Sequence, residues 1–150
     1  MFVALEALDV QAALARLLTE TSALFQQTRL FRRNAAGPLV EALCDLFGRQ
    51  CTDLERGEAA IIARIVALGC EPPLMAPETL WLSEIRDSAT MIMTLTDGHA
   101  RAGAAAADLV RAACEAGDLS TADLARFRVE VHQRTAAMYR VVQRFQPTGQ

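Results

Sequence analysis

Two cysteines and a glutamate lie along one face of a predicted helix. Cys44, Cys51 and Glu55 are separated by seven and four residues, so an α-helix places them on the same side. Thiolate and carboxylate groups would suit a softer metal ion, with Glu41 and Asp45 as further oxygen donors. The alternative is a packed interface between subunits, because buried cysteine commonly behaves as a small hydrophobic residue. We favour the packing interpretation.

The chain contains two histidines, His99 and His132, in different predicted helices. A helical histidine with a satisfied hydrogen bond is commoner than a helical metal ligand. Neither histidine forms a recognisable hydrolase motif with a serine or cysteine, so Ser-His or Cys-His catalysis is poorly supported. We therefore expect structural roles for both.

Four long helices are needed to position these residues. Apolar side chains recurring every three or four residues predict helices over about 5–33, 39–68 and 84–116, and a fourth that reaches about 145. Ser120 is the expected cap of the fourth helix, with Asp123 near its positive end. The core positions expected on the first helix are Val10, Leu14, Leu17, Thr21, Leu24, Thr28 and Phe31.

The second and third predicted helices are joined by a long connection. Glu71-Pro72-Pro73 interrupts the chain, and Pro77–Leu82 can form only a short helix. Four long helices with this crossover predict an all-α, ferritin-like four-helix bundle in a single domain, 1–150, with a frayed tail at 146–150. Inside the predicted helices, glycines indicate close packing: Gly48, Gly57, Gly98 and Gly103.

Composition limits the classes of function. The chain is 52 % hydrophobic and only 5 % aromatic, without an apolar run of about 20 residues that could span a membrane. The four cysteines lack zinc-knuckle spacing, which indicates reduced thiols in the cytoplasm. The net charge is −3, and the fifteen basic residues are scattered arginines without a basic tail, so DNA binding is not expected.

Several short motifs follow one another along the chain. The first helix ends in Arg32-Arg33-Asn34-Ala35-Ala36-Gly37-Pro38, and the second ends in Ala67-Leu68-Gly69. Later come Ala116-Gly117-Asp118, Thr121-Ala122-Asp123, and then Glu130, His132 and Thr135. The chain resembles Dps-type mini-ferritins over nearly its whole length. This resemblance implies self-assembly into a shell, normally of twelve subunits, that oxidises Fe(II) with peroxide and stores the ferric product.

The resemblance also implies that the usual ferroxidase centre has been lost. Between two subunits, that centre takes one histidine from the first helix and a histidine, two aspartates and a glutamate from the second. The matching residues here are Arg32, Cys44, Gly48, Ala59 and Ala63. Glycine and alanine side chains supply no donor atom, and a protonated guanidinium cannot coordinate a metal cation and repels it. We expect no metal at this centre and no resident cofactor, although iron could still bind elsewhere.

Two further features depend on the resemblance. The matched position of Arg32 faces inward in the family, and a buried arginine would need an acidic partner, for which Glu55 and Glu58 are candidates. Glu115, Asp118 and Asp123 cluster where related shells line a threefold pore with acidic residues that attract cations. Helix capping and ordinary solvated carboxylates are the alternative explanation for these three acids.

The leading hypothesis is a non-catalytic Dps-related shell component, assembling alone or with an active paralogue. The second is an iron-storage or stress-protection protein that loads iron through acidic pores without the usual centre. The third is a DNA-compacting Dps-like protein, which the scattered arginines disfavour.

Overall fold

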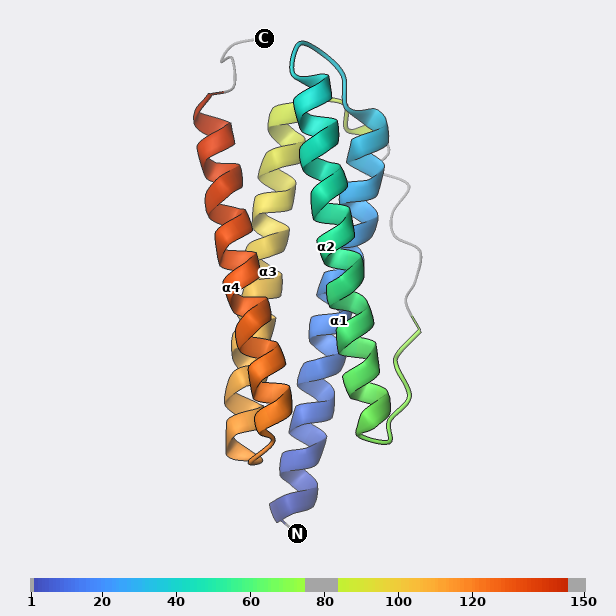
Figure 1. Cartoon of the computed structure of the whole chain (residues 1–150), viewed down its shortest axis with the longest axis vertical. Coiled ribbons are helices and arrows are strands. Elements are labelled where there is room, and N and C mark those ends of the chain that lie inside the picture. The colour runs from blue at the N-terminus through green and yellow to red at the C-terminus, as the bar shows by residue number, and fades with distance from the viewer. Residues whose placement is uncertain (1, 75–83, 146–150) are drawn as a thin grey trace.

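Four long α-helices make up the bundle in this computed structural model, which describes residues 2–74 and 84–145. The helices are α1 (Phe2–Asn34), α2 (Val40–Ala67), α3 (Ser88–Glu115) and α4 (Leu119–Arg144). Figure 1 shows α1 and α4 running toward one end of the bundle and α2 and α3 running toward the other. The end of α2 and the start of α3 therefore lie at opposite ends, as a ferritin-like crossover requires. The predicted all-α bundle is confirmed, whereas the expected short helix at 77–82 and the tail at 146–150 lie outside the described residues.

The core follows the stripe predicted from the sequence. All seven positions expected on α1 are buried, including the two threonines, whose hydroxyls donate to carbonyls one turn earlier. One half of the core surrounds Phe47 and Leu95, and the other surrounds Leu14 and Leu109. Because α3 packs closely on α4 and α1 packs on both α2 and α3, these side chains join the four helices.

Helix α3 begins later than the sequence pattern predicts. The expected start at residue 84 is wrong, because Asp87 has an extended backbone and caps the helix. Its side chain accepts a hydrogen bond from the backbone N–H of Thr90 at 2.8 Å. The bond from the Thr90 hydroxyl, followed by this backbone bond, lowers the pKa of Asp87. The carboxylate thus satisfies a backbone donor that the first turn would leave unpaired.

The predicted cap of α4 is also wrong. Asp118, rather than Ser120, occupies the cap position and accepts from the Thr121 backbone N–H at 3.1 Å. Gly117 ends the preceding turn with a φ of +71°, a conformation that favours glycine. Since the turn is this short, α4 begins at Leu119, and Ser120 is already an exposed residue of its first turn.

The glycine at position 98 allows α1 and α3 to approach closely, as predicted. A Cβ atom at Gly98 would lie 2.6 Å from Cδ2 of Leu24, too close for an unshifted side chain. Leu24 is buried at this crossing, so the glycine and the leucine fill the space together.

Replacing Phe47 by alanine should destabilise the bundle strongly. The Phe47 ring is fully buried and meets Tyr139 edge-on, with ring centroids 6.4 Å apart. Loss of this ring from a packed core should lower the free energy of unfolding by about 3–5 kcal/mol. Urea unfolding followed by circular dichroism measures the change. The exposed Gln133 of α4 provides the control, because Gln133→Ala should change stability by about 0.5 kcal/mol or less at the same protein concentration. Equal losses would contradict the assignment of Phe47 to the core.

Candidate functional site

The residues matched to the ferroxidase centre lie at the end of α1 and along α2. The guanidinium of Arg32 lies against Gly48: a Cβ atom at Gly48 would be 3.0 Å from Cζ of Arg32. The Cys44 thiol donates to the Arg32 carbonyl oxygen at 3.6 Å. The structure therefore gathers Arg32, Cys44 and Gly48, whereas Ala59 and Ala63 are exposed further along α2.

Arg32 is exposed in the single chain. It forms no ion pair with either proposed partner, Glu55 or Glu58, in the part of the chain that the structure describes. The expected pairing is therefore not present within one subunit. The Arg32 guanidinium occupies the space beside α2 that the absence of a side chain at Gly48 leaves open.

The cysteines and Glu55 do not form a compact metal-binding group. Partial burial raises the pKa of the Cys51 thiol, although the charges of Arg32 and Arg29 act in the opposite direction. Cys51 is therefore protonated at neutral pH, and a protonated thiol is a poor metal ligand. In residues 2–74 and 84–145, no three His, Cys, Asp or Glu side chains are grouped closely enough to hold a metal ion.

The two histidines contact each other in the centre of the bundle. Nδ1 of His99 and Nδ1 of His132 are 2.9 Å apart, and both rings are buried. If both rings are neutral, this bond contains one proton, so one ring is protonated on Nδ1 and the other on Nε2. Burial is the main cause that lowers the pKa to about 4 for His99 and about 2 for His132. Their expected structural role agrees with this geometry.

A buried arginine lies close to the histidine pair. Arg128 is only 2 % exposed, and its Nη2 atom lies 3.5 Å from Oδ2 of Asp53 on α2. Its positive charge contributes to the low pKa of both histidines. A Cβ atom at Gly57 would be 2.5 Å from Cζ of Arg128, so the glycine provides the space for the guanidinium.

These side chains form a buried polar layer, defined here as Asp53, His99, Arg128, His132 and Tyr139. Each has at least one buried polar atom without a hydrogen-bond partner among the described residues. Burial, followed by the nearby Cys51, raises the pKa of Tyr139 far above its usual value, so the phenol remains neutral. Sequence reasoning missed this layer. The spacing of Arg128, His132 and Tyr139 on one face of α4 could have revealed it.

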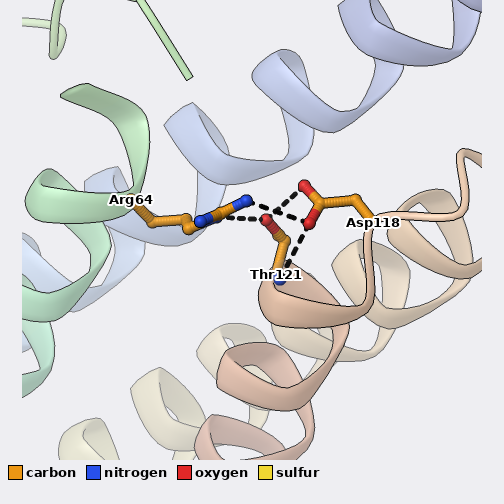
Figure 2. Close-up of polar contacts among 3 residues, drawn as sticks. All are labelled: Arg64, Asp118 and Thr121. Atoms are coloured by element: carbon orange, nitrogen blue, oxygen red, sulfur yellow. Dashed lines mark hydrogen bonds and ion pairs between the residues drawn. The ribbon is translucent and has the colours of Figure 1, made fainter. Parts of the chain in front are cut away.

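Of the three predicted pore residues, Asp118 has a clear structural role. Figure 2 shows its carboxylate facing both Thr121 and Arg64. Arg64 donates to Asp118 at 3.0 Å and to the Thr121 hydroxyl at 2.8 Å. Burial raises the pKa of Asp118, but the bonds from Thr121 and the Arg64 charge outweigh it and hold the pKa below its usual value. The capping explanation therefore accounts for Asp118. Asp123 forms an ion pair with Arg126 at 3.2 Å, and Glu115 is exposed to solvent.

This bundle geometry can be compared with known proteins. Neither a protein-family model nor a curated protein sequence matches the chain. Among solved structures, Dps from Thermosynechococcus elongatus superposes with a TM-score of 0.86 and 19 % identity, covering 95 % of this chain and 94 % of that one. The fold is that of the Dps-type mini-ferritins. An archaeal Dps homologue from Halobacterium salinarum gives 0.85 and 20 %, covering 97 % and 84 %.

A more divergent structure shares the Dps-type fold. The bacterioferritin-related protein from Bacteroides fragilis, described as a dodecameric thioferritin, has a TM-score of 0.75 and 16 % identity, covering 94 % of this chain and 92 % of that one.

In the Dps-type bundle described here, no helix within the described ranges combines the length and apolar character needed to cross a lipid bilayer.

Removing the α4 cap should cost more stability than removing the neighbouring exposed carboxylate. Asp118→Ala removes both the cap and the partner of Arg64, and should lower the free energy of unfolding by about 1–2 kcal/mol. Asp118→Asn retains an acceptor for the Thr121 N–H and should cost less. The control is Asp123→Ala, which removes an exposed ion pair and should cost about 0.5 kcal/mol or less. Equal costs in chemical denaturation would contradict the structural role of Asp118.

The histidine pair should make the protein sensitive to acid. Because burial lowers both native pKa values, the unfolded chain binds protons first as the pH falls below about 6.5. Down to about pH 4, stability should decrease by about 1.4 kcal/mol per pH unit for each histidine that the unfolded chain protonates. His99→Gln and His132→Gln should each reduce this slope. Urea titrations at a series of pH values test the prediction, and unchanged slopes would contradict it.

Proposed function

We propose that the chain is a non-catalytic, ferritin-like shell subunit that has lost the Dps ferroxidase centre. The single observation that supports this most strongly is the Arg32 guanidinium beside Gly48. Two positions that the family resemblance assigns to metal ligands thus hold a permanent cation and a residue without a side chain. Ala59 and Ala63 add no donor atoms, so Fe(II) would meet repulsion without compensating ligands.

The centre of the bundle is also a poor site for iron. Ferritin-like di-iron proteins hold metal there with inward-facing glutamates and histidines from the four helices. Here the two histidine Nδ1 atoms face each other, and the buried Arg128 supplies positive charge beside them. Asp53 is the one carboxylate of the polar layer, and it already pairs with Arg128. Neither location supports the donor set that ferroxidase chemistry needs.

Exposed apolar side chains support self-assembly. On α4, Leu119 is 68 % exposed and Phe127 is 57 % exposed, while α1 presents Leu5 and Leu8. Large exposed apolar side chains on several helices favour burial against other subunits. By analogy with the dodecameric Bacteroides protein, we propose a twelve-subunit shell, formed alone or together with an active paralogue. The four free thiols agree with a cytoplasmic location.

Iron loading through an acidic pore receives less support. Asp118 is paired with Arg64 and Asp123 with Arg126, so two of the three proposed carboxylates already have cationic partners. This neutralisation weakens the attraction for metal cations that such a pore would need. We therefore prefer the structural role over the iron-storage role.

The proposal predicts a large particle with negligible iron and no ferroxidase activity. Light scattering and metal analysis should be made on protein purified from iron-supplemented cells, followed by peroxide-coupled Fe(II) oxidation measured spectroscopically. The oxidation rate should equal the protein-free background, because the matched positions lack iron ligands. A Dps protein with an intact ligand set, expressed and assayed in parallel, provides the positive control. A rate above background or an iron-filled shell would contradict the loss of function, whereas a monomer would contradict the shell.

A further inference from the structure

A shallow hollow of about 400 Å³ lies beside the end of α1 and the first half of α2. Its lining residues are Arg32, Asp45, Gly48, Arg49 and Thr52. Four of these come from successive turns of α2, and Arg32 reaches them from α1. The volume falls within the range of small-molecule sites, and the lining is predominantly polar, which suits a charged ligand better than an apolar one.

Positive charge in this hollow exceeds negative charge. Neither Arg32 nor Arg49 forms an ion pair in the part of the chain that the structure describes, in contrast to Arg64 and Arg128. Asp45 is the one carboxylate in the lining, so two guanidinium groups outnumber it. Arg29 adds positive charge nearby, since both it and Arg32 act on the thiol of Cys51.

Gly48 determines where one of these guanidinium groups lies. A Cβ atom at Gly48 would lie 3.0 Å from Cζ of Arg32 and 3.1 Å from its Nη2 atom. The planar guanidinium therefore lies directly against the α2 backbone. The hydroxyl of Thr52 donates to the Gly48 carbonyl oxygen at 3.2 Å, which uses its proton within the helix. The available hydrogen-bond donors of the hollow are therefore those of the arginines.

We propose that this hollow binds a small oxyanion of the phosphate class through the guanidinium groups of Arg32 and Arg49. Guanidinium presents several N–H donors in a plane that matches the oxygens of phosphate, and the resulting bonds are charge-assisted. A metal cation is disfavoured there by the same charges. The inference rests on the proposed function in one respect: the positions matched by Arg32 and Gly48 lie between two subunits in the family, so a neighbouring subunit of the proposed shell would border the hollow. The two proposals fail separately, because loss of the shell appears as a monomer in light scattering and loss of the site appears as absent phosphate binding.

Inorganic phosphate is the probe for an isothermal titration of the purified protein at pH 7 and constant ionic strength. Arg32→Gln and Arg49→Gln should each weaken binding at least tenfold, because each removes a charged donor. Gly48→Ala should weaken binding by a smaller factor, since the added methyl group shifts the Arg32 guanidinium slightly while the net charge is unchanged. Asp45→Asn should strengthen binding severalfold by removing the opposing charge. Circular dichroism and thermal melting confirm that each variant is folded.

The matched control is Arg140→Gln, which removes an exposed arginine on α4 that does not line the hollow. It changes net charge by the same amount as Arg32→Gln and should leave phosphate affinity unchanged. An equal loss in Arg140→Gln would overturn the proposal in favour of non-specific attraction. Absence of phosphate binding at millimolar concentrations would also overturn it, as would binding of duplex DNA without binding of inorganic phosphate. A phosphate affinity that depends on Arg32 and Gly48 but not on Arg140 would establish the site.

Discussion

The close approach of arginine guanidinium groups to glycines of α2 shapes both polar regions of this bundle. Gly48 receives Arg32 from α1, and Gly57 receives Arg128 from α4. A glycine within a helix costs about 0.5–1 kcal/mol relative to alanine. At Gly57 a Cβ atom would lie 2.5 Å from Cζ of Arg128, so a side chain there would clash, whereas at Gly48 the corresponding distance to Arg32 is 3.0 Å and the fit is merely tight. Helix α2 therefore holds one cation near solvent and another in the interior.

The interior cation adds to the effect of burial at the bundle centre. Arg128 is nearly inaccessible to solvent, whereas the side chain of its counter-ion Asp53 is 35 % exposed, and an ion pair of this kind contributes little net stability. Burial is the main reason that the pKa values of His99 and His132 are low and both rings stay neutral, and the Arg128 charge acts in the same direction. The neutral rings can then share a proton between their Nδ1 atoms. This arrangement uses one nitrogen of each ring in a structural hydrogen bond.

The helices and the core could be predicted because many residues contribute to each pattern. The apolar stripe of α1 extends over six turns, so a local irregularity does not hide it. The helix starts depended on single side chains, and neighbouring candidates such as Asp118 and Ser120 compete for the same role. The geometry after Gly117 decided between them, and the sequence does not give that geometry directly.

At the candidate site, the lack of metal-binding side chains could be predicted from the sequence, whereas the contacts between helices could not. Residue types alone indicate that Gly48, Ala59 and Ala63 cannot bind a metal. The contact between Arg32 and Gly48, and the one between His99 and His132, join different helices, so their discovery required the packed structure. The number of residues between two positions does not indicate whether they will contact each other across two helices. Here the glycines within α2 gave the one local hint of a close neighbour.

The Arg32–Gly48 contact also means that the two residues act as a pair. Arg32→His alone would supply one imidazole but leave Gly48 without a side chain to complete a metal site. Gly48→Asp alone would place a new carboxylate against the Arg32 guanidinium, where an ion pair would form in preference to metal coordination. Either single change therefore leaves the region unsuited to Fe(II). The electrostatic character of the hollow depends on both positions, and its preference for anions over cations follows from their combination.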